Sequence, residues 1–103
     1  MKDPVAPAAA LLGERIRRAR LDLGLSQEAI AGLAAMHVTN FGKIERGVAN
    51  PSLLTVVRIA TALGTDVAFL TQDIKREHLP PDHRVHSARE YLRERRRRSR
   101  RSS

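Results

Sequence analysis

The sequence predicts an all-α protein, a compact five-helix domain followed by a disordered basic C-terminal tail. Between Leu12 and Leu70, apolar residues recur at the three- and four-residue spacing of helices, and helix-capping residues separate the segments. No alternating pattern typical of a β-strand occurs before residue 72. The chain has 103 residues, of which 42% are hydrophobic, so it holds one domain at most.

The first helix is expected to begin at Leu11, after a flexible N-terminal segment at residues 1–10 that contains two prolines. One face of this helix is apolar and its outer face is basic, and Gly24 is expected to end it. The apolar face consists of Leu12, Ile16, Ala19 and Leu23.

The second helix is expected at residues 26–34. Ser26 is a favourable N-cap because its hydroxyl can accept a hydrogen bond from a free backbone N–H of the first turn. The apolar stripe of this helix consists of Ile30, Leu33 and Ala34.

The third helix is expected at residues 37–46, directly after a short Ala35-Met36 link, with Gly47 as its end. Phe41 is interpreted as a core residue that packs against Ile30 and Ile44, rather than as an aromatic side chain that stacks on a ligand. Gly42 inside this helix costs up to about 1 kcal/mol relative to Ala. Its presence is therefore either tolerated or due to a group that lies close to the backbone there.

The fourth helix follows the turn Asn50-Pro51-Ser52 and ends at Gly64. Either Thr65 or Asp66 can cap a last short helix that runs through Leu70. The apolar stripe of the fourth helix consists of Leu53, Val56, Val57, Ala60 and Leu63.

Most of the positive charge lies after the helical domain. The net charge is +8, yet residues 1–71 carry 8 basic and 6 acidic side chains, whereas residues 72–103 carry 11 and 5. We therefore interpret 11–71 as the folded domain and 72–103 as a disordered tail that suits a polyanion. The arginines of this tail are expected to neutralise the phosphates of a nucleic acid without sequence preference; alternatively, the tail is a solvated disordered terminus or a contact for a protein partner. They are Arg93, Arg95, Arg96, Arg97, Arg98, Arg100 and Arg101.

Several other classes of protein are not supported. The chain has no cysteine, which excludes disulfides and thiolate metal sites and agrees with a cytoplasmic protein. The longest apolar stretch, residues 5–12, is too short to span a membrane and contains Pro7, and the N-terminus does not have the pattern of a signal peptide. No cofactor is expected.

No catalytic or metal-binding constellation is recognisable, and we do not expect an enzyme. Three histidines and one aspartate in the tail have the chemistry of a metal cluster, but Pro80-Pro81 and the polar composition give no frame to hold them. These four residues are His78, Asp82, His83 and His86.

Two short helices joined by a tight link form a helix-turn-helix. Four pieces in this region have a characteristic order and spacing: Leu-Gly-Leu-Ser-Gln-Glu at 23–28, Lys-Ile-Glu-Arg-Gly at 43–47, Asn-Pro-Ser at 50–52 and Arg-Ile-Ala-Thr-Ala-Leu-Gly at 58–64. With these pieces the sequence resembles the phage repressor and Cro type helix-turn-helix family, also called the XRE family, over roughly residues 11–71. The resemblance implies a lambda-repressor-like fold that binds double-stranded DNA.

The resemblance implies that the third helix lies in the DNA major groove. The residues at the base-reading positions of the family are Val38, Thr39, Asn40 and Lys43. Thr39 and Asn40 can donate and accept hydrogen bonds at a base edge, and Lys43 can reach a guanine or a phosphate. His37 departs from the family, which usually has Ser or Thr as the cap at this position.

The resemblance also implies phosphate contacts by Gln27, Arg46 and Asn50. Alternatively, Gln27 is an ordinary solvated side chain and Asn50 caps the fourth helix. For Glu45 a structural role is favoured, in which it pairs with Arg46 or with another arginine.

The expected function is that of a sequence-specific transcriptional regulator, a repressor that binds a partly palindromic operator as a homodimer. Leu54 and Leu70 are the predicted apolar surface for a partner. Two rivals use the same fold, the antitoxin of a toxin–antitoxin pair and a restriction–modification controller. A third rival is a protein-interaction adaptor without specific DNA readout. A toxin or RNA polymerase is a candidate protein partner.

Overall fold

The computed structural model of the chain describes residues 3–83 and 85–102, and these residues form helices and loops without any strand. The helices are α1 Pro7–Asp22, α2 Gln27–Leu33, α3 Val38–Glu45, α4 Leu53–Leu63, α5 Val67–Thr71, the 3₁₀ helix η1 Arg76–His78 and α6 Ala88–Ser102. The all-α class is therefore confirmed. Parts of the predicted N-terminal segment and tail, namely residues 1–2, 84 and 103, lie outside the described residues.

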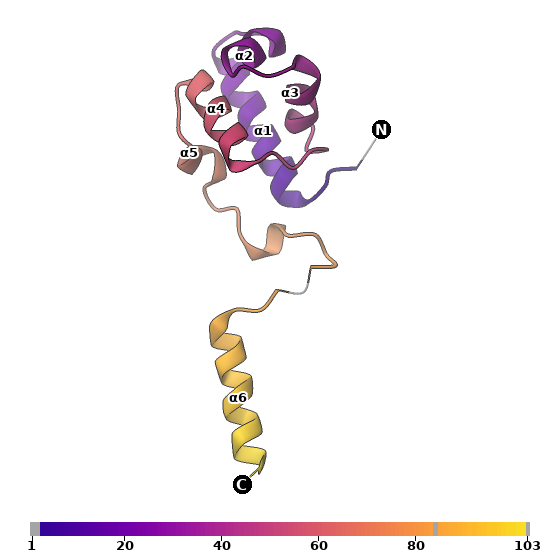
Figure 1. The fold of residues 1–103 in the computed structure, drawn as a ribbon, viewed down its shortest axis with the longest axis vertical. Helices are drawn as coiled ribbons and strands as arrows, with labels where there is room; N and C mark the ends of the chain where they lie inside the picture. Colours follow the sequence, from indigo (N-terminus) through magenta and orange to yellow (C-terminus); the bar gives the residue numbers. More distant parts are fainter. Residues whose placement is uncertain (1–2, 84, 103) are drawn as a thin grey trace.

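Helices α1 to α5 pack into one compact unit around a single hydrophobic core (Figure 1). α1 lies at its centre and packs against α3, α4 and α5, while α2 packs against α3 and α4. Each of the helices α1 to α5 contributes one of the largest fully buried side chains. They are Ile16, Ile30, Phe41, Ile59 and Leu70.

Two helices of the domain, α2 and α5, begin at a predicted cap. The Ser26 hydroxyl accepts a hydrogen bond from the Ala29 N–H at 3.0 Å. The Asp66 carboxylate accepts one from the Phe69 N–H at 2.8 Å, which decides between the two predicted caps of α5. α4 ends at Gly64, whose φ of +76° lies in the left-handed region that favours glycine.

α1 starts at Pro7, four residues before the predicted start at Leu11. A proline at the first helical position loses no hydrogen bond, and its φ is already helical, so Pro7, which was assigned to the flexible segment, is the start of α1. The segment before it is attached to the domain, because the Val5 N–H donates to the Gly47 carbonyl at 2.8 Å.

The apolar stripes are shifted relative to the prediction. Leu33 and Leu53 are exposed, at 66% and 67%, and the core positions are taken by Ala31 and Ile59 instead. In helices of two to three turns, several apolar stripes fit the same sequence. The stripe that is buried is decided by the helices packed against it.

Of the two residues predicted to form an apolar partner surface, Leu54 and Leu70, only Leu54 lies on the surface. Leu54 is exposed at 75%, as predicted, but Leu70 is completely buried against the core. α5 has only five residues, and its C-terminal end turns toward α1, where the Arg15 guanidinium donates to the Leu70 carbonyl at 3.1 Å. Phe69, the preceding residue, is the one exposed to solvent.

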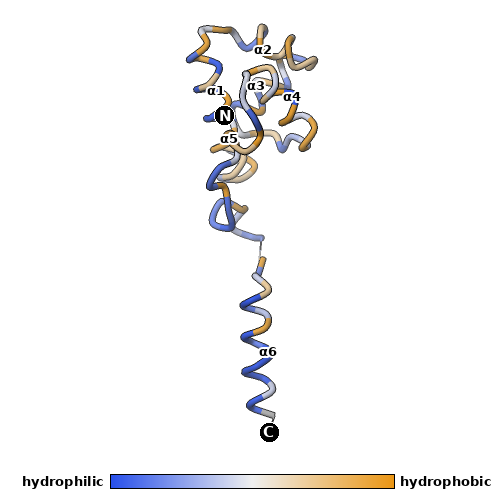
Figure 2. The backbone as a smooth tube through the Cα atoms, turned by 90° about the vertical axis from the view of Figure 1, so that its left-hand side faces the viewer, coloured by the Kyte–Doolittle hydropathy of each residue, from blue (hydrophilic) through white to orange (hydrophobic). Residues whose placement is uncertain are grey.

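The segment predicted as a disordered tail begins on the domain and ends in a helix that stands apart from it (Figure 1). Ile74 packs against the core, whereas α6 has no buried residue among its described side chains. The radius of gyration is 18.3 Å, against about 13 Å for a compact chain of this length. Figure 2 shows α6 as mostly hydrophilic. Disorder of this segment in solution stays a prediction.

None of the helices in the described ranges is long and apolar enough to span a bilayer.

Candidate nucleic-acid interface

The link between α2 and α3 turns the chain within four residues. Ala35 has a φ of +56°, in the left-handed region that residues with a side chain rarely adopt. Its N–H donates to the Gly32 carbonyl at 3.1 Å, and the Met36 N–H donates to the Ala31 carbonyl at 3.0 Å. α3 starts directly after this turn, with His37 as its N-cap. The His37 side chain makes no capping hydrogen bond, so it does not replace the usual Ser or Thr.

α3 has a buried side and an exposed side. Phe41 and Ile44 face the core, which confirms the interpretation of Phe41 as a core residue. The four predicted base-contacting residues, Val38, Thr39, Asn40 and Lys43, are all exposed. Helical geometry places Thr39, Asn40 and Lys43 within about 100° of one another, while Val38 lies on another side of the first turn.

A buried ion pair joins the first and third helices. The Arg20 Nε donates to the Glu45 Oε2 at 2.7 Å, and its Nη2 donates to the Oε1 at 3.0 Å. Both residues are buried, at 8% and 7% exposure. The predicted structural role of Glu45 is therefore confirmed with a distant arginine as partner, and the carboxylate raises the pKa of the Arg20 guanidinium further.

Arg20 is a residue whose role the sequence reasoning missed. It follows Ile16 by four positions, on the buried side of α1, so its position on the apolar face was the available signal. A buried arginine needs a partner of opposite charge. The only buried acidic residue among those the structure describes is Glu45.

Gln27 is tied to the same ion pair. Its Nε2 donates to the Glu45 Oε1 at 2.9 Å, which excludes the alternative of a freely solvated side chain. Glu45 therefore receives hydrogen bonds from α1 and from the first residue of α2. This arrangement fixes the start of α2 relative to α3.

The side chains of Gln27 and Arg46 meet over Gly42. A Cβ atom built on Gly42 would lie 3.6 Å from the Gln27 Oε1 and 3.1 Å from the Arg46 Nη1. The glycine is thus explained by groups that lie close to the backbone. Two residues predicted to contact phosphate, 19 positions apart in the sequence, are brought together beside the exposed side of α3.

Asn50 lies exposed in the loop between α3 and α4. It does not cap α4, because the Ser52 hydroxyl accepts the hydrogen bond from the Thr55 N–H at 3.2 Å. The alternative role of Asn50 as the helix cap is therefore wrong, and its side chain has no hydrogen bond among those found in the described part of the chain.

The tail arginines lie on α6, away from α3 (Figure 1). At the start of α6, Arg76 and His86 both bind the Glu90 carboxylate, and we call these three residues the clamp at the start of the helix. These two partners lower the pKa of Glu90 to about 2. The tail histidines are used in separate local contacts, since the His78 Nδ1 accepts the Lys75 N–H at 3.0 Å, and the described residues contain no metal-binding group of three.

Comparison with known protein families identifies a match over most of the helical unit. A sequence model of a family described as a helix-turn-helix domain matches residues 11–70, which is α1 to α5 apart from the start of α1 and the last residue of α5.

Among curated relatives, the chain is 33% identical over 60 residues to a protein of Bacillus subtilis, the SPbeta prophage-derived uncharacterized HTH-type transcriptional regulator YonR. The match covers 58% of this chain, and the chain spans only 56% of the length of that relative.

Two solved structures share the fold. The restriction–modification controller protein C.AhdI of Aeromonas hydrophila superposes with a TM-score of 0.59 at 37% identity, over 60% of this chain and 94% of the controller. The P22 c2 repressor protein, solved in complex with a synthetic operator, superposes with a TM-score of 0.57 at 26% identity, over 60% of this chain and 94% of the repressor.

Proposed function

Because the chain belongs to the helix-turn-helix domain family of DNA-binding regulators, we propose that α3 reads an operator in the major groove. The observation that carries the proposal is the composition of the exposed side of α3. Its polar side chains suit base edges, and the groups beside them suit phosphates. The P22 c2 repressor, which shares the fold, was solved on an operator, and this supports the same use of α3 here.

Thr39, Asn40 and Lys43 form the base-reading group of the proposal. A hydroxyl and an amide can each donate and accept at a base edge, so Thr39 and Asn40 can distinguish base pairs. Lys43 donates to the O6 and N7 of guanine. Val38, at the first turn, offers an apolar contact for a thymine methyl group.

Gln27 and Arg46 form the phosphate clamp of the proposal. Glu45 accepts one N–H of the Gln27 amide, which leaves the second N–H for a phosphate oxygen. The Arg46 guanidinium beside it adds a charged donor. Asn50 supplies a further amide donor from the loop after α3. Such contacts set the position of the protein on the duplex, while α3 supplies the sequence preference.

The proposed acting form is a homodimer that represses transcription by covering a promoter. One α3 makes few base contacts, and two copies on half-sites about 34 Å apart would match a partly palindromic operator. An exposed apolar area on the domain is the candidate surface for the second copy. It consists of Leu53, Leu54 and Val57 on α4.

A second candidate function is control of a restriction–modification system. It is favoured by the likeness to C.AhdI, because the chain covers 94% of that controller at 37% identity. Both candidates use the same DNA interface, and they differ in the genes that the operator governs.

The tail arginines are proposed to add affinity for any DNA sequence. Cations that neutralise phosphates release counterions, so this part of the affinity falls steeply with salt. Removal of residues 93–103 is expected to weaken binding to all duplexes and to flatten the salt dependence.

The proposal is tested with single substitutions on an operator selected from random duplexes. Thr39→Ala and Lys43→Ala are each expected to weaken operator binding by about 5- to 150-fold, equal to about 1–3 kcal/mol, with a smaller change on unrelated DNA. Lys75→Ala is a matched control at an exposed position away from α3 and from the candidate dimer surface, and it should bind as the unchanged protein does.

Equal losses on operator and unrelated DNA would show that α3 does not read bases. Unchanged binding by both α3 variants would refute the placement of α3 in the groove.

A further inference from the structure

The arginines of α6 are not distributed evenly around the helix. Four of them follow one another at the spacing i, i+4, i+7 and i+11, which places them within about 60° of one another around the axis. They extend over about 16 Å of helix. This set, which we call the arginine stripe, consists of Arg89, Arg93, Arg96 and Arg100.

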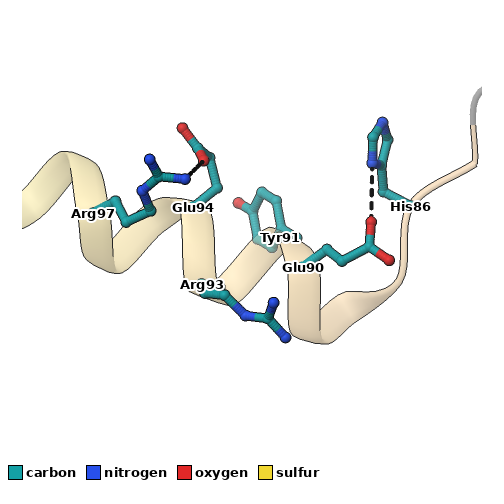
Figure 3. A pocket seen from close by; sticks show the side chains of 6 residues that line it. All are labelled: His86, Glu90, Tyr91, Arg93, Glu94 and Arg97. Atoms are coloured by element: carbon teal, nitrogen blue, oxygen red, sulfur yellow. Dashed lines mark hydrogen bonds and ion pairs between the residues drawn. The ribbon is translucent and has the colours of Figure 1, made fainter.

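The two acidic residues of α6 lie beside the stripe rather than within it, about 90° and 130° from its middle, and both have partners outside the stripe. Glu94 pairs with Arg97 and with Arg98, both at 3.7 Å, and Glu90 is held by the clamp at the start of the helix. In Figure 3, Arg93 projects from one side of α6 while Glu94 and His86 lie on the opposite side. The partners found for these two carboxylates are Arg76, His86, Arg97 and Arg98, none of which belongs to the stripe.

Within the part of the chain that the structure describes, three members of the stripe have no carboxylate partner. Arg89, Arg93 and Arg96 take part in none of the ion pairs found among residues 3–83 and 85–102. A fifth arginine, Arg95, is used differently, since its guanidinium lies 5.8 Å from the centre of the Tyr91 ring. α6 thus has one strongly cationic face and another on which most charges are paired.

The start of α6 is fixed by side chains from the preceding segment. Arg76 binds the Glu90 carboxylate through two nitrogens, and its Nη2 also donates to the Val85 carbonyl at 2.9 Å. The Ser87 hydroxyl accepts the Glu90 N–H at 3.2 Å as an N-cap. These contacts favour a helix in α6 despite the repulsion among its arginines.

We propose that the arginine stripe binds the sugar-phosphate backbone of duplex DNA beside the operator, with α6 helical and with its opposite face turned away from the DNA. This inference rests on the proposed function and deepens it, because it assigns the DNA contact to one face and adds Arg89 to the contacting residues. One strand of a duplex carries a phosphate per 3.4 Å of its axis, so 16 Å of stripe passes about five phosphates.

The chemistry of the stripe favours a phosphate partner. Guanidinium groups bind phosphate oxygens with two parallel hydrogen bonds. All four members of the stripe are arginines, and the exposed Leu92 beside Arg96 is a single apolar side chain rather than an apolar surface for a protein groove. The nine residues 79–87 join α6 to the domain and reach at most about 30 Å, so a domain on its operator keeps α6 close to flanking phosphates.

The test compares two full-length variants that lose the same charge, one from the stripe and one from arginines of α6 outside the stripe. The stripe variant carries Arg→Gln at positions 89, 93, 96 and 100, and the control variant carries Arg→Gln at positions 95, 97, 98 and 101. Binding to operator and unrelated duplexes is measured by fluorescence anisotropy from 50 to 200 mM salt. The anisotropy titrations give the salt slope of each variant.

The stripe variant is expected to lose about 3.6 from the slope of log affinity against log salt, because four phosphate contacts disappear. Over this range the unchanged protein should therefore lose about 150-fold more affinity than the stripe variant does. The control variant should keep a slope within about 1 of the unchanged protein. The helix breaker Leu92→Pro, which keeps every arginine, should flatten the slope as well.

Equal slopes for the two quadruple variants would overturn the inference, because a disordered polycation does not distinguish the sides of α6. An unchanged slope for Leu92→Pro would overturn it too. If the stripe variant loses affinity for single-stranded RNA but not for duplex DNA, the partner class is wrong. In each case a retained operator preference leaves the proposed function standing, whereas a protein without any sequence preference refutes that function itself.

Discussion

Replacement of Arg20 by Met should strongly destabilise the domain. The substitution keeps an unbranched side chain of similar length but removes the guanidinium that pairs with Glu45. The Glu45 side chain is only 2% exposed, so water cannot replace the lost partner. The carboxylate would keep one hydrogen bond, from Gln27, and its charge would stay buried.

The magnitude follows from the contacts that are lost. Two hydrogen bonds between charged groups disappear, at 2.7 Å and 3.0 Å, and each is worth about 1.5–3 kcal/mol. Removal of one partner from a buried ion pair typically costs about 3–5 kcal/mol. Since small domains unfold at a cost of about 5–15 kcal/mol, Arg20→Met should remove a large part of the stability.

The assay is urea denaturation of the full-length protein followed by circular dichroism at neutral pH. Arg18→Met is the matched control on the same helix, because Arg18 pairs with Glu14 at 3.5 Å in an exposed position. This exposed pair is worth less than about 1 kcal/mol. Equal losses for the two variants would refute the reasoning. A double variant with Arg20→Met and Glu45→Leu should regain most of the loss, because no charge stays buried.

Three further predictions concern local features of the fold. Gly13→Ala should lower the free energy of unfolding by about 2–3 kcal/mol in a urea titration, because its Cβ would collide with carbonyl oxygens at the end of α3. Gly32→Ala is the control, since its Cβ would meet open space, and it should raise the free energy of unfolding by up to about 1 kcal/mol. A similar effect of the two substitutions would refute the close packing of Gly13 against α3. Ala35→Gly should raise the melting temperature by relieving the left-handed backbone, for a gain of about 0.5–1 kcal/mol, and a fall would contradict the turn geometry. The pKa of Glu90 is lowered from 4.5 to about 2, so its ion pair with Arg76 is present above pH 4.5 and is lost as the pH falls through about 2. NMR titration of the Glu90 carboxyl carbon should show a midpoint at about pH 2, and Arg76→Gln should move that midpoint toward 4.5. A midpoint near 4.5 in the unchanged protein would show that Arg76 and His86 do not bind Glu90.

The sequence predicted the elements of the domain because local signals define them. Ser26 and Asp66 cap helices as predicted, and Gly64 ends one, since each acts on the backbone a few residues away. The buried faces were less predictable. The exposure of Leu53 and the complete burial of Leu70 depend on how short helices rotate against their neighbours, and that information is spread over the whole domain.

The exposed residues of the candidate interface could be predicted from the sequence, but the contacts among the buried residues beneath it could not. The resemblance to a known family placed Thr39 and Lys43 at base-reading positions, and the structure exposes both on α3. It gave no sign that Arg20 pairs with Glu45 across 25 residues, or that Gln27 joins them. Such pairs form only when the packing of three helices excludes water from one point.

The division of the α6 arginines was also hidden in the sequence. A run of arginines resembles a uniform polycation when it is read as a disordered tail. Helical geometry together with the ion pairs to Glu94 distinguishes the members of the stripe from Arg97 and Arg98. Which arginines of α6 are paired depends on where the helix places its two acidic residues, Glu90 and Glu94.

The central claim is that α3 reads a DNA sequence, and in-vitro selection from a random duplex library tests it most directly. The full-length protein and the variant with Thr39→Ala and Lys43→Ala are selected in parallel at two salt concentrations. The account predicts that the unchanged protein enriches one partly palindromic motif with half-sites about 34 Å apart and that the variant loses this motif. Enrichment of no motif by the unchanged protein, with uniform binding that disappears at the higher salt, would contradict the claim.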